Sequence, residues 1–213
     1  MATTIPKKVA LIITSTRAVR VGPTVVSFVH KVLLTSPSTP KPEISIIDIA
    51  SFNLPVFNER VVPALIPKHG QFQYKHSKAW SAAIKQFDGY IIVAAEYNHG
   101  VPGGLKNAID YLYHEWTGKP VLIITYGVHG GNFSSDALKE TLSVVMKLRV
   151  VETRPTLKFA GPGMEEAMMA GMGRVGPKTM EEWEEIAKEP FLKGFEELVE
   201  LLETPAQEPT KAA

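Results

Sequence analysis

Five short apolar runs, each followed by an amphipathic stretch, constrain the fold of this chain more than any other feature. The apolar runs are residues 9–14, 43–49, 89–94, 120–125 and 149–152. Apolar residues recur at helical spacing between and after them, in residues 24–34, 77–87, 104–114, 134–147 and 181–203. This repeated order of strand and helix predicts an α/β fold with a parallel sheet and helices on both faces. The runs are almost continuously apolar, which is typical of strands covered on both sides.

Three segments lack such a pattern. Residues 51–74 hold several prolines and no clear period, so we expect a long loop that acts as a lid or an interface element. Residues 161–178 are rich in Gly, Met and Pro and are expected to form a mobile flap. We expect a single domain over residues 1–203 and a disordered tail over residues 204–213.

Composition excludes several classes of function. The formal net charge is only +1, so no strong field recruits nucleic acid or anionic lipid. The chain has no cysteine, which excludes disulfides and thiolate metal sites and suits a reducing compartment as well as export. The apolar run at residues 9–13 is too short for a signal peptide, and no run approaches the roughly 20 residues that cross a bilayer. We expect a cytoplasmic protein that binds neither nucleic acid nor membrane.

The loop after the first apolar run is a candidate phosphate site. It contains Ser15, Thr16 and Arg17, and a helix is expected to start near Pro23. Hydroxyls, backbone N–H groups and a guanidinium then meet at a helix N-terminus, an arrangement that binds phosphate. Proline suits the first helical position because an N–H is not needed there. The alternative is that Ser15 and Thr16 cap the helix while Arg17 is solvated.

The absence of known motifs narrows the range of phosphate ligands that this loop could bind. No G-x-x-x-x-G-K-[ST] loop for a triphosphate occurs, and no G-x-G-x-x-G follows the first run. One such string, GMGRVG at residues 171–176, follows MEEAMMA and no strand, so we interpret it as a chance match. A phosphate-accepting signalling domain would need carboxylates after the first strand, and this loop has none. A single terminal phosphate, as on FMN, suits a short Ser/Thr loop.

A polar and aromatic loop follows the third run and bends through Pro102, Gly103 and Gly104. Gly100 and Gly103 permit backbone angles closed to other residues, and such a loop can turn N–H groups toward the edge of a flat ring. Backbone donors on the edge of a flavin stabilise its reduced form. Planar side chains could pack beside such a ring, or they could be an ordinary core tyrosine and surface histidine. The loop residues are Glu96, Tyr97, Asn98, His99 and Gly100.

The fourth run ends in a third loop, which is rich in glycine. Tyr126 could stack on a ring, and Gly127 and Gly130 would let the backbone approach it. The alternative is a plain turn capped by Asn132 or Ser134. All three loops follow the carboxyl ends of predicted strands, where open α/β sheets bind their ligands.

The strings TSTRAVRVGP, AAEYNHGVPGGLKNAIDYLYHEWTGKP and TYGVHGG resemble the three flavin loops of the NAD(P)H-dependent FMN reductases. These are flavodoxin-like quinone reductases, and the chain is most similar to the fungal members. The resemblance covers roughly residues 7–152. Family members usually have Gly in place of Thr14 and Pro in place of Ala95, and neither change removes a hydrogen-bond donor.

The resemblance implies a flavodoxin-like three-layer sandwich, whose five-stranded parallel sheet has the order 2-1-3-4-5. It implies that FMN is bound non-covalently, that NADPH or NADH donates the hydride, and that a quinone, a free flavin or a similar small acceptor receives the electrons. By position, Ser15, Thr16 and Arg17 would hold the phosphate. The isoalloxazine ring would be held by Glu96, Tyr97, Asn98, His99, Gly100, Tyr126, Gly127 and Gly130.

The resemblance also implies a homodimer with the flavin near the subunit interface. Tyr113, Trp116 and the loop around Phe57 are then either contact residues or plain core aromatics. Hydride transfer through a flavin needs no side-chain acid or base, so we name no catalytic residue. The sequence has no G-x-S-x-G and no H-E-x-x-H, and we name no metal ligand.

Two other functions remain open at this point. One is a flavodoxin-like electron carrier without NAD(P)H turnover of its own, although such carriers tend to be strongly acidic and this chain is not. The other is a flavin-gated interaction or sensor protein that acts on a partner through residues 161–178.

Overall fold

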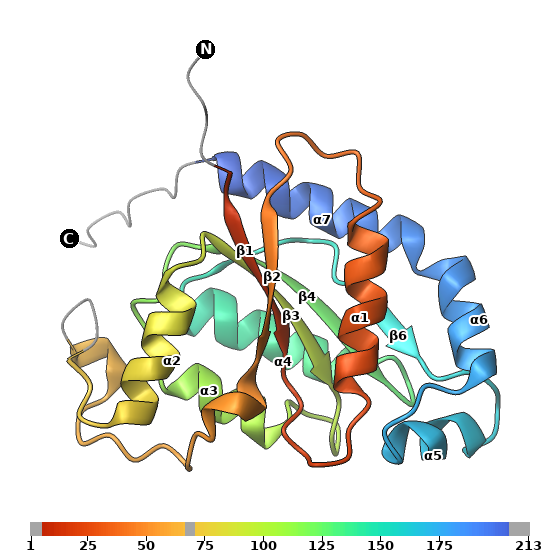
Figure 1. The fold of residues 1–213 in the computed structure, drawn as a ribbon, viewed down its shortest axis with the longest axis horizontal. Helices are drawn as coiled ribbons and strands as arrows, with labels where there is room; N and C mark the ends of the chain where they lie inside the picture. The colour runs from red at the N-terminus through yellow and green to blue at the C-terminus, as the bar shows by residue number, and fades with distance from the viewer. Residues whose placement is uncertain (1–5, 67–70, 205–213) are drawn as a thin grey trace.

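The computed structural model describes residues 6–66 and 71–204, which form a parallel sheet between two layers of helices (Figure 1). The strands are β1 (Lys8–Ile13), β2 (Glu43–Asp48), β3 (Gly89–Ala95), β4 (Pro120–Gly127), β5 (Arg149–Val150) and β6 (Thr156–Lys158). Their order is β2-β1-β3-β4-β5, every pair is parallel, and β6 pairs with β4 outside this path. The predicted flavodoxin-like α/β fold and the order 2-1-3-4-5 are therefore confirmed.

Each predicted helix is present with shifted bounds. The α-helices are α1 (Gly22–Leu33), α2 (Lys75–Lys85), α3 (Gly103–Asp110), α4 (Asn132–Glu140), α5 (Glu165–Gly171), α6 (Pro177–Ile186) and α7 (Lys188–Glu203). Two short 3-10 helices and one π-helical turn accompany them: η1 (Ile49–Phe52), η2 (Pro63–Leu65) and η3 (Thr141–Val145).

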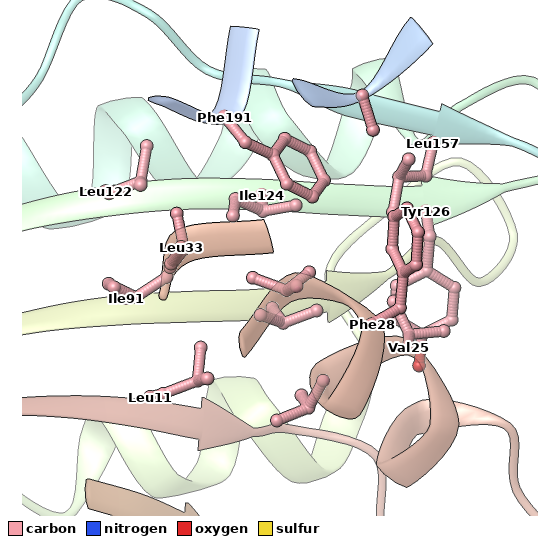
Figure 2. Packing of buried hydrophobic residues seen from close by; sticks show 14 of the residues in the cluster. Leu11, Val25, Phe28, Leu33, Ile91, Leu122, Ile124, Tyr126, Leu157 and Phe191 are labelled. Atoms are coloured by element: carbon pink, nitrogen blue, oxygen red, sulfur yellow. The ribbon is translucent and has the colours of Figure 1, made fainter. Parts of the chain in front are cut away.

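The core is divided by the sheet into two apolar clusters. Alternate residues of each strand point to opposite faces, so Leu11 packs against α1 and α7 while Ile12 packs against α2 and α3. Figure 2 shows Phe28 of α1 and Phe191 of α7 lying over the first of these faces. Both rings are almost fully buried, and burying a side chain of this kind contributes about 2–3 kcal/mol. Every residue of β3 and β4 is buried, which explains their unbroken apolar sequences.

The fifth strand is interrupted, which the sequence did not predict. Residues 149–152 were expected to form one strand, but β5 has two residues and β6 continues along the same edge of β4. Between them, Thr153 donates its N–H and its hydroxyl to the carboxylate of Glu197 on α7. Pro155 has no N–H to donate, so the ladder cannot continue through it.

The C-terminal region has more helix than expected. Residues 161–178, predicted as a flap, contain α5 and the beginning of α6, and the predicted helix 181–203 is two helices that meet at Ala187. The predicted tail lies outside the described residues, apart from Thr204. The predicted loop 51–74 contains η1 and η2, and its residues 67–70 also lie outside the described residues.

Candidate functional site

The loop between β1 and α1 buries a hydroxyl that has no partner. Ser15 is 2% exposed, and its Oγ makes no hydrogen bond to any described residue. α1 starts at Gly22 without a side-chain cap, so its first N–H groups also face the loop unpaired by side chains. A Cβ on Gly22 would overlap Ser15 Oγ, so only glycine permits this approach. The structure thus contains the predicted pairing of a hydroxyl with a helix N-terminus, and Ser15 does not cap α1.

Two arginines in this loop have different surroundings. Arg17 is exposed, and its guanidinium carbon lies 5.8 Å from the centroid of the Tyr97 ring. Arg20 makes a two-pronged ion pair with Asp48, with N–O distances of 2.9 and 2.6 Å, and it also donates to the carbonyl oxygen of Ser15. Arg17 was predicted from the sequence as a site residue, and Arg20 was not. Asp48, at the end of the neighbouring strand β2, is the signal that could have identified it.

The Arg20–Asp48 pair is held in its charged form. Burial alone would raise the pKa of Asp48, but hydrogen bonds from Arg20 and from the Ala50 N–H outweigh it and hold this pKa below its usual value. The hydrogen bond to Asp48 likewise raises the pKa of Arg20. Because both groups stay ionised, Arg20 ties the backbone of the β1–α1 loop at Ser15 to the end of β2 at all ordinary pH values.

The loop after β3 contains a tight hairpin turn over residues 97–100. The Tyr97 N–H donates to the Gly100 carbonyl at 3.1 Å, and the Gly100 N–H donates back at 3.0 Å. Asn98 (φ 51°) and His99 (φ 57°) are both left-handed, as in a type I′ turn. The left-handed backbone angles of this loop therefore fall on Asn98 and His99 and not on Gly100 or Gly103. An asparagine tolerates this region through its short polar side chain. The N–H groups of Asn98 and His99 are the donors that the turn itself does not use.

Glu96 joins the second loop to the third. Its carboxylate accepts hydrogen bonds from the N–H groups of Phe133 at 2.8 Å and Ser134 at 3.2 Å, at the start of α4. α4 has no side-chain cap at its own N-cap residue, so Glu96 fills that role from another loop. The ring of His99 stacks on Phe133 with centroids 4.5 Å apart. Both bonds go to one oxygen of the carboxylate, and the Glu96 N–H donates to the Tyr126 carbonyl at 3.1 Å.

The third loop follows β4 and is closed by its own hydrogen bonds. Gly130 N–H donates to the Gly127 carbonyl, and the Thr125 hydroxyl donates to the Gly130 carbonyl, both at 3.1 Å. Tyr126 is buried, and this burial raises its pKa to about 12, so its phenol is protonated and neutral beside Ser15. The hydroxyl of Ser134 is buried without a partner among the described residues and does not cap α4.

A cavity of about 170 Å³ opens where the three loops meet. Its volume is smaller than the 300–1,000 Å³ of a typical ligand pocket. A mononucleotide would therefore lie partly in the cavity and partly along its open rim. Six of the predicted residues line it: Ser15, Arg17, Glu96, Tyr97, Tyr126 and Gly127.

The cavity wall also contains residues that the sequence analysis missed. They are Arg20, Val21, Ala95, Val128, Phe159, Ala167, Ala170 and Gly171, of which the last three belong to α5.

Five predicted residues do not line the cavity. Thr16 lines a neighbouring hollow together with Ile49, Asn53 and Gly104. Asn98, His99 and Gly100 form the hairpin turn described above, and Gly130 lies buried in the third loop. Trp116, considered as a subunit contact, is 2% exposed and belongs to the core.

Two further features bear on function. Within residues 6–66 and 71–204, the structure shows no cluster of three or more His, Asp or Glu side chains that could hold a metal ion. None of the helices in this described part is long and apolar enough to cross a membrane.

Comparison with known proteins shows the family to which this chain belongs. The model of the NADPH-dependent FMN reductase family matches residues 7–160. The NAD(P)H-dependent FMN reductase ntnL of Nectria sp is 47% identical over 201 residues, which cover 94% of this chain and 99% of that protein. A quinone reductase of Escherichia coli K12 is 43% identical over 93 residues, which cover 41% of this chain and 44% of that protein.

The fold has counterparts among solved structures. FerB, a flavoenzyme NAD(P)H:(acceptor) oxidoreductase from Paracoccus denitrificans, superimposes with a TM-score of 0.58 at 20% identity, covering 89% of this chain and 97% of that one. This likeness shows the shared fold. Together with the family match over most of the chain, the three loops at one sheet edge place this protein in the NADPH-dependent FMN reductase family, as an FMN-dependent NAD(P)H oxidoreductase.

Proposed function

We propose that FMN is held without a covalent bond in the cavity and along its rim, with its phosphate at residues 14–22. The observation that carries this proposal is the Ser15 hydroxyl, which is buried without a partner beside the uncapped N-terminus of α1. Ser15 Oγ and the first N–H groups of α1 would donate to the phosphate, and Arg17 would add charge-assisted bonds. Thr16 would contribute through its backbone, because its side chain packs against Gly104.

The isoalloxazine ring is assigned to the second and third loops. The N–H groups of Asn98 and His99 lie at the tip of a rigid turn and can donate to the polar edge of the ring. Tyr97 and Tyr126 would pack beside it, and the backbones of Gly127 and Gly130 would approach it. The Glu96 bridge to α4 keeps these two loops at a fixed separation.

When bound, FMN supplies the redox chemistry, taking a hydride from NADPH or NADH and passing the electrons to a quinone or a free flavin. The chain supplies binding and position. Tyr126 stays protonated and so carries no negative charge that would repel the phosphate. Phe159 and Ala170 form an apolar part of the cavity wall. A quinone acceptor is supported by the name of the Escherichia coli relative.

We also propose that the protein is a cytoplasmic homodimer. Two apolar side chains on the loop around Phe57 are exposed to solvent, Val56 at 87% and Leu65 at 74%, and a second copy of the chain would cover them. The absence of cysteine suits a reducing compartment. Analytical ultracentrifugation and imaging of a fluorescently tagged chain test the two parts of this proposal.

The central test is the absorbance spectrum of the purified protein, followed by anaerobic titration with NADPH. We expect a flavin spectrum that bleaches on titration and returns when a quinone is added. A protein that binds FMN but is bleached by neither NADPH nor NADH would instead be an electron carrier or a flavin-gated sensor. A protein that binds no FMN would contradict the site itself.

A further inference from the structure

The segment that comes after the family match contributes to the same site. The family model ends at residue 160, and α5 and α6 come after it. Ala167, Ala170 and Gly171 of α5 nonetheless line the cavity together with the phosphate-loop residues. Figure 1 shows α5 and α6 packed as a corner next to the beginning of α1. The contacts that keep this corner in place therefore matter for the cofactor.

The buried carboxylate of Glu166 joins α5 to α6. Glu166 of α5 is 7% exposed and accepts the backbone N–H of Thr179 at 3.0 Å. The hydroxyl of Thr179 accepts the N–H of Ala160 at 3.0 Å, which links α6 to the chain just after β6. α6 has no side-chain cap at its own N-cap residue, Gly176, and a Cβ there would overlap the Glu166 carboxylate. Glu166 thus caps α6 from α5, and the last glycine of GMGRVG makes room for it.

The loop after α5, which contains Gly173, lies close to residues 19–20 of the loop between β1 and α1. Gly173 has φ +82°, and a Cβ at this position would lie 3.2 Å from Val19 Cγ1, 3.4 Å from Arg20 N and 3.5 Å from Arg20 O. The side chain of Arg20 in turn binds the Ser15 carbonyl and Asp48. Contacts therefore link Gly173 through Arg20 to Ser15, and Glu166 joins the two helices on either side of the loop that contains Gly173.

We propose that Glu166 and Gly173 are positioning residues for the FMN phosphate: Glu166 fixes the α5–α6 corner, and Gly173 braces the backbone of residues 19–20. This inference rests on the proposed placement of the phosphate at residues 14–22. It accounts for the second glycine of GMGRVG by a close packing contact. The Gly173 contact is made with residues 19–20, at the end of the site assigned to the phosphate.

The test compares FMN with riboflavin, which has the same ring and no phosphate. Dissociation constants are measured by flavin fluorescence on apoprotein for Glu166→Ala, Glu166→Gln and Gly173→Ala. We expect Glu166→Ala and Gly173→Ala to raise the FMN dissociation constant about tenfold and the riboflavin constant less than about twofold. Glu166→Gln keeps an acceptor oxygen for Thr179 and should recover most of the FMN affinity.

Two matched variants control for general loss of stability. Gly161 has a similar φ of +81°, and a Cβ there would meet no atom within 4 Å, so Gly161→Ala adds the backbone strain without pushing on residues 19–20. Glu197 holds Thr153 as Glu166 holds Thr179, but outside the cavity, so Glu197→Ala removes a similar bond elsewhere. Both should bind FMN as the wild type does. Should Glu166→Ala fail to fold, Gly173→Ala with its Gly161→Ala control decides the question.

The outcomes separate this inference from the function on which it rests. If the wild type binds FMN and the variants bind FMN equally well, or lose FMN and riboflavin to the same degree, the positioning role is refuted while the proposed site stands. If the wild type binds neither flavin, both proposals are overturned. A selective loss of FMN affinity that the two controls do not show supports the brace.

Discussion

The Glu96 carboxylate lies 2.8 Å from the backbone nitrogen of Phe133, and this contact fixes the loop after β3 to the N-terminus of α4. A carboxylate at this position satisfies two helix N–H groups that the N-cap residue, a glycine, cannot reach. The same helix start carries the ring on which His99 stacks. One side chain therefore determines the spacing of two of the three loops that form the cavity.

Replacing Glu96 should destabilise both the fold and the site. We expect Glu96→Ala to lower the free energy of unfolding by about 1 kcal/mol, as loss of a helix cap does, and to weaken FMN binding. Glu96→Gln keeps an acceptor oxygen and should lose less on both counts. Urea unfolding and FMN titration measure the two effects, with Glu140→Ala on the exposed face of α4 as the control. Equal stability of Glu96→Ala and the wild type would refute the capping role.

Two adjacent glycines at the start of α3 should respond differently to alanine. A Cβ on Gly104 would lie 2.6 Å from Thr16 Oγ1 and 2.7 Å from its Cγ2, whereas a Cβ on Gly103 would meet nothing within 4 Å. We expect Gly104→Ala to cost about 1–3 kcal/mol through overpacking and to displace the phosphate loop, and Gly103→Ala to gain up to about 0.5–1 kcal/mol. Urea unfolding checks both values. A larger loss for Gly103→Ala than for Gly104→Ala would contradict this assignment.

The two arginines of the loop between β1 and α1 should have separate effects on FMN binding and on stability. Arg17 is exposed and has no ion pair within the described part of the chain, so Arg17→Ala should leave the unfolding free energy within about 0.5 kcal/mol of the wild type. It should nevertheless weaken FMN binding about tenfold or more, so that the purified protein loses its yellow colour. Arg20→Ala leaves Asp48 and the Ser15 carbonyl without their partner and should cost about 1–3 kcal/mol. Circular dichroism, urea unfolding and FMN titration distinguish the two patterns.

The strands were predictable from sequence because burial on both faces of a sheet leaves a local signal. Unbroken apolar runs such as residues 120–125 are visible without knowing which elements cover them. β6 was missed because it has three residues and only Leu157 is buried, so its pairing with β4 depends on a distant partner. α5 was missed because it has only seven residues and lies in a segment rich in Gly, Met and Pro, and its place is set by the contacts of Glu166 with α6.

The site was predictable where its residues come directly after a strand. Ser15 and Tyr126 could be placed at one sheet edge because both lie at the carboxyl ends of parallel strands. Arg20 was not predicted beside Arg17, because its role is visible only when the loop is considered together with Asp48 in another strand. Local sequence likewise does not show that the Glu96 side chain points toward α4 or that Gly173 lies against residues 19–20. Both depend on tertiary structure.

Lys119 provides a prediction about pH that is independent of the flavin. Its ammonium donates to the Tyr90 hydroxyl at 2.9 Å and to the Lys85 carbonyl at 3.1 Å, at the opposite end of β4 from the cavity. Burial lowers the pKa of Lys119 to about 8, against an ordinary value of 10.5 in the unfolded chain. Below pH 8 both states carry the charge, and the folded state bears the full cost of burying it.

Between pH 8 and pH 10.5 the unfolded state binds more protons than the folded state, so this group makes stability rise with pH. We expect the unfolding free energy of the wild type, minus that of Lys119→Met, to increase by about 1–2 kcal/mol from pH 7.5 to pH 9.5, a value reduced for partial exposure of the side chain. Burial raises the pKa of Tyr90 well above its ordinary value of 10, so its ionisation lies outside this window. Urea unfolding at each pH gives the difference, and Lys78→Met on the exposed side of α2 should show no such increase. A difference that stays flat or falls across this range would show that Lys119 is not desolvated in the folded protein.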